Sequence, residues 1–191
     1  MALGLAAASG ATPLGLSAEQ QHRLAAGEVI VLDILPPGAS ESARGGTAVA
    51  FVRAAPERVW PVLVDYRGHP RYYPRVVSAE PVEVDAQHAL VRYEVGVGPF
   101  SFGFYMIKYP DPVRRRIDWR LDTSHANNFF RENTGYWQVD PADGGSLVTY
   151  AIAVRTILPG FATLGAERES LVDTIKKLRK LVEDEKGAAT R

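Results

Sequence analysis

The feature that most constrains the fold is a succession of six segments with alternating hydrophobicity, followed by one long amphipathic segment. The alternating segments are residues 76–84, 89–97, 100–109, 114–121, 129–139 and 147–155. Their period of two is typical of β-strands, and the short connections between them are rich in Gly, Pro and Asp, as tight turns are. Because short connections join strands of opposite direction, this part of the chain is predicted to form an antiparallel meander.

The long amphipathic segment, residues 161–185, is predicted to be a helix that covers the sheet. Leu164, Leu171 and Ile175 recur on one of its faces at helical spacing. At 1.5 Å per residue, about 25 residues span roughly 37 Å, which is enough to cross the whole sheet. A long meander curls, and its concave apolar face must pack against another element. Since a straight helix does not fill a curved sheet along its full length, we expect a cavity between the two.

The chain before the meander is predicted to contain an extension and two short helices. Residues 1–16 are expected to be a disordered or processed arm, and residues 17–46 an extension with one helix and a strand at residues 28–35. A short helix is predicted to start at Pro56, and a second short turn follows it. Residues 47–185 then form one ligand-binding domain, because a chain of 191 residues suits a single core with a short extension.

Composition and charge narrow the class of partner. The 22 basic residues balance the 22 acidic ones, so we expect no nucleic acid partner. The absence of cysteine is compatible with either the cytoplasm or the periplasm. No segment approaches 18 consecutive apolar residues, which predicts a soluble protein.

Alternation also indicates which strand positions face the concave side of the sheet. In two strands an apolar row lies opposite a charged row, and in a third a bulky aromatic row lies opposite a row of small residues. We expect the apolar and bulky rows to face inward, where an aromatic side chain serves either as plain core or as a ligand contact. The inward residues predicted in this way include Tyr93, Val95, Phe102, Phe104, Met106 and Trp119.

The register of residues 129–139 stays open, because one row mixes polar and apolar side chains. That row contains Arg131, Asn133 and Trp137. If it faces inward, Arg131 and Asn133 could hydrogen-bond the polar end of a ligand, and the buried guanidinium would need an anionic partner. The alternative is that Arg131 faces water near the end of its strand.

Short motifs recur along the chain in a recognisable order. They are Ala55-Pro56-Glu57, Val59-Trp60, Asp65-Tyr66, Tyr73-Pro74 and the later segment GYWQVDPADGGSLVTYAIAV. Over residues 47–183 this set resembles the START-like superfamily, which includes polyketide cyclases, coenzyme Q-binding proteins and the birch pollen allergens. The resemblance implies an α+β helix-grip fold, in which a curved antiparallel sheet wraps around a long C-terminal helix and two short helices lie at one end.

The resemblance further implies that an internal cavity binds an apolar small molecule, a lipid of the sterol, phospholipid or quinone class, and that the protein transports it. No cofactor, metal ligand or catalytic residue is expected. Combined with the alternation, it predicts a set of ligand-binding residues. The set is Tyr73, Tyr93, Val95, Phe102, Phe104, Met106, Trp119, Arg131, Asn133, Trp137, Leu164, Leu171 and Ile175.

Two other functions remain open. One is an enzyme similar to polyketide cyclases and dehydratases, and the other is a module that binds and modulates another protein. The four histidines are scattered, and Ser124 and His125, adjacent on a predicted loop, make a poor catalytic pair. These observations favour a carrier over an enzyme.

A basic cluster of Arg67, Arg71 and Arg75 interleaves with Tyr72 and Tyr73. Arginines beside aromatic residues suit a membrane interface that contains anionic lipid. The cluster therefore fits either ordinary surface charge or transient contact with a membrane surface.

Overall fold

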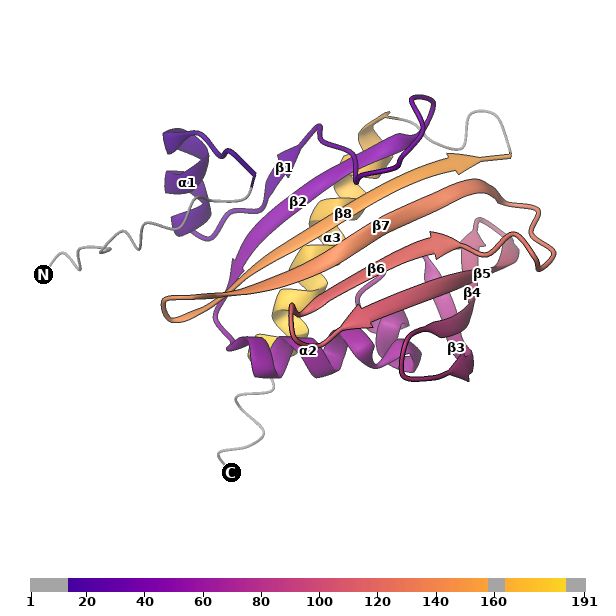
Figure 1. The fold of residues 1–191 in the computed structure, drawn as a ribbon. Coiled ribbons are helices and arrows are strands. Elements are labelled where there is room, and N and C mark those ends of the chain that lie inside the picture. The colour runs from indigo at the N-terminus through magenta and orange to yellow at the C-terminus, as the bar shows by residue number, and fades with distance from the viewer. Residues whose placement is uncertain (1–13, 158–163, 185–191) are drawn as a thin grey trace, which may run out of the picture.

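The computed structural model describes residues 14–157 and 164–184, with residues 164–167 described by their backbone (Figure 1). The strands are β1 Ile30–Leu32, β2 Arg44–Val52, β3 Val76–Val84, β4 Ala89–Val97, β5 Phe100–Asp111, β6 Arg116–Leu121, β7 Phe130–Ala142 and β8 Gly145–Thr156. The helices are α1 Ala18–Ala25, α2 Pro56–Val64, the 3-10 helix η1 Tyr66–Arg71, and α3 Leu164–Asp184.

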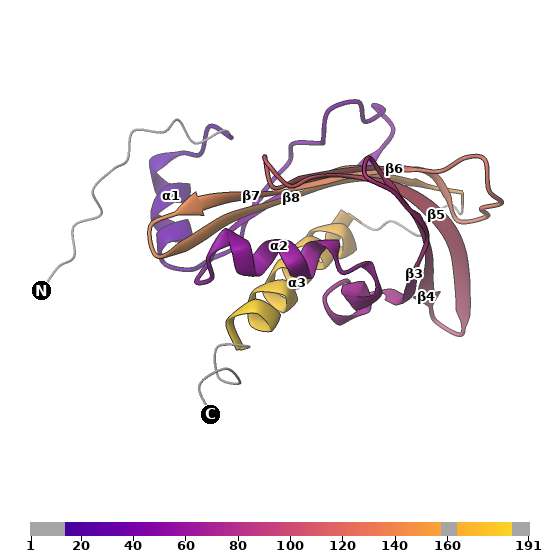
Figure 2. The ribbon, with the colours of Figure 1, turned by 60° about the horizontal axis from the view of Figure 1, so that its bottom comes forward.

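The strands form one antiparallel sheet in the order β1-β2-β8-β7-β6-β5-β4-β3. Strands β3 to β8 follow one another as the predicted meander, and β8 pairs with β2. Figure 2 shows that the sheet curves around α3, while α2 and η1 lie at one end of the concave side. The predicted helix-grip architecture is therefore confirmed.

Helix α3 is held to the sheet by the apolar face that its sequence predicted. Leu171, Ile175, Leu178 and Val182 are all at most 2% exposed. At the other side of the helix, the Arg179 guanidinium donates to the carbonyl of residue 27 at 2.8 Å. The helix thus touches both the sheet and the N-terminal extension, and it closes the concave side.

The predicted strand bounds hold for some strands and shift for others. Strands β3 and β4 have the predicted bounds. Strand β2 begins at Arg44, inside the predicted extension of residues 17–46, because Gly45 and Gly46 pair with β8. A Cβ at Gly45 would lie 1.9 Å from the Ile152 carbonyl oxygen, so only glycine lets the two strands come this close.

The predicted strand at residues 28–35 is shorter than expected, because the chain leaves the sheet after β1 and crosses its convex face. Thr47 of β2 donates its hydroxyl to the Ile34 carbonyl at 2.6 Å. Further along, the Ser40 backbone N–H donates to the Glu132 carboxylate of β7 at 2.9 Å. Ala151, on the convex side of β8, is fully buried. The extension therefore gives this end of the sheet a second covered face.

Candidate ligand-binding cavity

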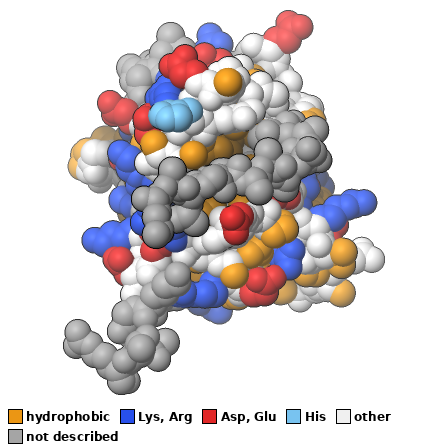
Figure 3. Space-filling view, turned by 90° about the vertical axis from the view of Figure 1, so that its left-hand side faces the viewer, with side chains coloured by type: hydrophobic (Ala, Val, Ile, Leu, Met, Phe, Trp, Pro, Cys, Tyr) orange, Lys and Arg blue, Asp and Glu red, His pale blue; other side chains and the backbone are white. Residues whose placement is uncertain are grey.

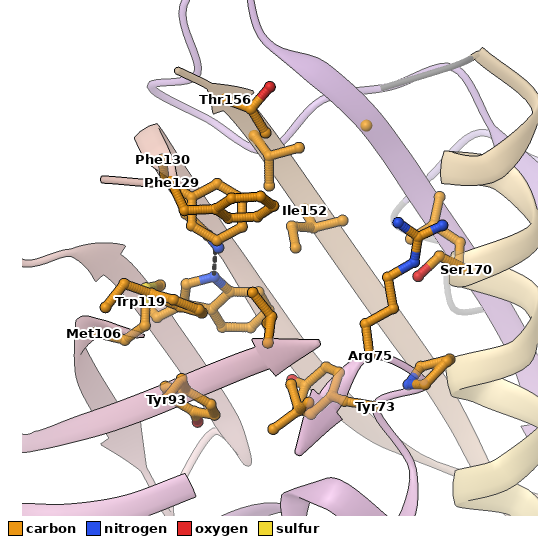
Figure 4. A pocket seen from close by; sticks show the side chains of 18 of the residues that line it. Tyr73, Arg75, Tyr93, Met106, Trp119, Phe129, Phe130, Ile152, Thr156 and Ser170 are labelled. Carbon is orange, nitrogen blue, oxygen red and sulfur yellow. Dashed lines mark hydrogen bonds between the residues drawn. The ribbon is translucent and has the colours of Figure 1, made fainter. Parts of the chain in front are cut away.

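A cavity of about 200 Å³ lies between the concave face of the sheet and α3 (Figure 4). Its wall is mostly aromatic or aliphatic, which suits an apolar guest. The exposed residues Pro74 and Arg75 lie at its mouth, where Arg75 extends toward Ser170 of α3. The predicted residues that line the cavity are Tyr73, Tyr93, Val95, Phe104, Met106, Trp119, Asn133 and Leu171.

Other predicted residues lie outside the wall. Phe102 is half-buried and does not line the cavity, and Ile175 is fully buried in the contact between α3 and the sheet. Trp137 lies behind the wall at 1% exposure and donates its indole N–H to the Tyr73 hydroxyl at 2.7 Å. It therefore supports a wall residue. Leu164 begins α3, but its side chain lies outside the described residues.

The inward placement of Arg131 is wrong. The register of β7 against β8 shifts between Phe130 and Glu132, so Arg131 occupies a β-bulge and is exposed. A bulge inserts one extra residue, and beyond it the row that contains Asn133 faces inward. Arg131 thus faces water, the alternative that the mixed row had left open.

The sequence prediction missed Lys108, which lines the cavity and is 4% exposed. It continues the inward row of β5 that begins with Phe104 and Met106, at the same period of two. That spacing was the available signal. It was missed because lysine is almost never fully buried without a partner.

Two further wall residues, Phe129 and Phe130, stand at the start of β7. The side-chain oxygen of Asn127 accepts the backbone N–H groups of both, each at 3.0 Å. This turn fixes the rings edge to face, with centroids 4.6 Å apart. The wall at this end of the cavity is therefore set by a side-chain cap on a loop, which alternation does not reveal.

The Lys108 ammonium has two aromatic neighbours and, among the described residues, no hydrogen bond or ion pair. Its Nζ lies 4.2 Å from the centroid of the Trp119 ring and 5.3 Å from that of Tyr93. Burial lowers the pKa of Lys108 to about 7. The rings offset part of the desolvation cost by cation–π attraction, but they supply no acceptor oxygen.

Trp119 lies over Lys108 because a glycine and an amide hold it there. Its indole N–H donates to the side-chain oxygen of Asn133 at 3.2 Å, the contact drawn in Figure 4. Across the strand pair, a Cβ on Gly135 would lie 2.5 Å from the Trp119 ring and 2.2 Å from the Ala151 carbonyl oxygen. The flat indole therefore occupies space that only a glycine leaves open.

His69 of η1 anchors the cavity wall from the plugged end of the sheet. It is 1% exposed, and its Nε2 donates to the Leu63 carbonyl at 3.0 Å. Its Nδ1 then accepts from the Tyr93 hydroxyl at 2.7 Å. Burial, followed by the charge of Lys108, lowers the pKa of His69 to about 3, so the ring is neutral. His69 is therefore a buried structural residue.

The buried His69 should make folding stability depend on pH below neutrality. Its pKa is about 3 in the folded protein and about 6.5 when unfolded. Between these values the unfolded chain binds the extra proton, so stability falls as the pH falls from 6.5 toward 3, by about 1.4 kcal/mol per unit. Urea denaturation at pH 7.5 and 4.5 should show wild type losing roughly 2–3 kcal/mol more than His69→Gln. Equal losses in the two proteins would contradict the assignment.

Ser124 and His125 meet a third polar residue but do not form a catalytic triad. The Asp122 carboxylate, 6% exposed, contacts His125 Nδ1 and accepts from the Ser124 hydroxyl at 2.9 Å. The Ser124 hydroxyl also contacts Nδ1 of His125, at 3.2 Å. A triad needs the serine on the opposite ring nitrogen, Nε2. The group therefore caps the loop after β6.

The basic cluster after α2 is divided by the fold. Arg67 pairs with Glu80 at 3.0 Å, and Arg71 pairs with Asp65 at 3.0 Å. The interleaved Tyr72 is fully buried. Only Arg75 of this cluster lines the cavity. Contact with a membrane surface remains a prediction, to which the buried Tyr72 adds no exposed side chain.

The family described as "Polyketide cyclase / dehydrase and lipid transport" matches residues 46–183. This range includes every strand of the meander and α3 as far as residue 183.

The chain belongs to the polyketide cyclase/dehydrase and lipid transport family. Solved structures show the same fold. The Zhui aromatase/cyclase from a Streptomyces species has a TM-score of 0.63 at 21% identity, over 78% of this chain and 98% of that one. A START superfamily protein from Mycobacterium smegmatis has a TM-score of 0.60 at 18% identity, over 72% and 96%. At these identities the similarity shows the fold alone.

A third structure with a similar fold is a STAR-related lipid transfer protein from Xanthomonas axonopodis. It has a TM-score of 0.60 at 16% identity, over 81% of this chain and 92% of that one. Comparison with curated proteins finds no match. In this member of the polyketide cyclase/dehydrase and lipid transport family, α1 and β1 precede the matched range. None of the described helices is both long and apolar enough to cross a membrane.

Proposed function

We propose that this protein binds an apolar molecule of lipid class in the cavity under α3 and carries it. The sterol, phospholipid and quinone classes remain the candidates. The observation that supports the proposal is the cavity of about 200 Å³, lined mainly by aromatic and aliphatic side chains, which the protein's own residues leave unfilled. Apolar surface around such a space gains free energy when a guest replaces water.

The size of the cavity bears on the class of guest. Pockets for drug-sized ligands usually measure roughly 300–1,000 Å³, above the 200 Å³ found here. A slim chain or a small ring system fits this space. A phospholipid is too large for this volume, so part of the molecule would have to extend out of the cavity past the mouth at Pro74 and Arg75.

Extraction of the freshly purified protein tests the proposal. Organic extraction followed by mass analysis should yield an apolar compound, and native mass spectrometry should show it bound at one copy per chain. The variant Ile152→Trp should lose the bound compound, because Ile152 lines the cavity and an indole there would fill it. Val82→Trp is the matched control, since Val82 is 58% exposed on β3. Equal occupancy of the two variants, or an empty wild type that takes up no lipid, would overturn the proposal.

A second candidate function, an enzyme similar to polyketide cyclases, is favoured by one observation. The wall contains the polar groups of Lys108 and Asn133, which a purely apolar carrier does not need. A carrier returns its guest unchanged, whereas a cyclase or dehydratase converts a poly-β-ketone probe with loss of water. Mass analysis of such a probe after incubation with the protein distinguishes the two.

A further inference from the structure

Lys108 is a buried cation that makes no hydrogen bond or ion pair with a described residue. It is 4% exposed, and its ammonium has three N–H donors. The described residues offer it the faces of Trp119 and Tyr93 but no carboxylate within ion-pair distance. Natural proteins almost always pair a buried charge, so the missing acceptor is expected to arrive with the ligand.

The charged side chains of the described residues that line the cavity are all positive. Among the described residues that line it, the cations are Lys108 inside and Arg75 at the mouth, and none is an aspartate or glutamate. An anion that enters would therefore meet attraction and no like charge from the wall. In a site screened from water such attraction is stronger than at the surface.

A second donor belongs to a residue that contacts the same indole as Lys108. The side-chain oxygen of Asn133 accepts from the Trp119 indole, and its amide NH₂ makes no hydrogen bond to a described residue, although Asn133 lines the cavity. Lys108 lies over the face of the same indole ring. Lys108 and Asn133 thus contact the same Trp119 indole, and each has N–H donors that lack an acceptor. Such donors suit the two acceptor oxygens of a carboxylate.

We propose that the ligand of this cavity is an amphipathic acid whose carboxylate binds the Lys108 ammonium and the Asn133 amide. The proposal rests on the proposed function and specifies its ligand. The hydrocarbon part then occupies the space bounded by Phe104, Phe129 and Phe130.

The other groups around Lys108 keep one protonation state near neutrality. Tyr93 on β4, Tyr73 after η1 and Tyr150 on β8 have pKa values raised by burial, and all three are neutral. His69 on η1 is neutral because its pKa is about 3. Arg75 lies at the mouth of the cavity. Lys108 is thus the group here that changes charge around pH 7, and acid binding should be tighter below that pH.

The test compares decanoic acid with 1-decanol, which has the same chain without the charge. Isothermal titration calorimetry at pH 6 should show the acid binding at least about tenfold more tightly than the alcohol. Between pH 6 and pH 8 acid binding should weaken by about tenfold, since the protonated fraction of Lys108 falls by that factor. Alcohol binding should not change with pH.

Lys108→Met keeps the length of the stem and removes the charge. This variant should bind acid and alcohol equally and lose the pH dependence, while Lys176→Met, an exposed change on α3, should behave as wild type. Thermal unfolding of both variants establishes that they fold. A wild type that binds the alcohol as tightly as the acid, or a Lys108→Met variant that keeps the preference, overturns the proposal. If neither compound binds wild type, the proposed function itself fails, and this inference fails with it.

Discussion

Replacing Trp137 with alanine should lower the free energy of unfolding by about 3–5 kcal/mol. Trp137 is 1% exposed, and its ring stacks on Tyr150 with centroids 4.2 Å apart. Its indole N–H donates to the Tyr73 hydroxyl, which would lose this donor on truncation. The cost combines a large cavity with a buried polar group left without its partner. Urea denaturation at constant pH measures it.

Phe100→Ala is the matched control for this change, because Phe100 is an aromatic residue of the same sheet that is 66% exposed. Its loss should cost well under 1 kcal/mol, as for surface positions in general. A cost for Trp137→Ala no larger than that of Phe100→Ala would show that the aromatic cluster behind the cavity does not stabilise the sheet.

An aspartate in place of Ile175 should detach α3 from the sheet. Ile175 is fully buried on the face of α3 that packs on the sheet, so the new carboxylate would be placed in apolar surroundings without a partner. Such changes are among the few that cost about 4 kcal/mol or more. Thermal unfolding should shift sharply downward, and a hydrophobic dye should bind the concave face once the helix leaves it.

The neighbouring change Lys176→Asp places the same side chain on the exposed face of α3 and should leave unfolding almost unaltered. If Ile175→Asp unfolds like this control and binds no dye, then α3 is not what covers the concave face. The pair of variants thus separates the effect of burial from the effect of a negative charge on the helix.

The fold could be predicted from the sequence because its signals are local and repeated. The period of two and the turn residues between segments predicted the bounds of β3 and β4, and the helical spacing of Leu171 and Ile175 identified the face of α3 that meets the sheet. These patterns depend on the backbone periods alone. They hold even where the identity of a neighbouring side chain is unknown.

The site was less predictable, for physical reasons that differ between residues. The bulge at Arg131 reverses the face of one residue, and a single inserted residue leaves no mark on the pattern. Lys108 follows the inward period, yet a lysine at such a position is ordinarily assigned to solvent. Trp137 and Trp119 are both predicted as ligand-binding residues, and only the packing shows that one lies behind the wall and the other in it.

The absence of a side chain at position 135 has a consequence for variation in this protein. Any larger residue there would collide with the Ala151 carbonyl oxygen and with the Trp119 ring. The Trp119 ring would then have to move away from the Lys108 amine. Any ligand preference that depends on this amine would change as a result. A mutation of Gly135, which pairs with Trp119 across the strands but does not line the cavity, would thus change which ligands the cavity accepts.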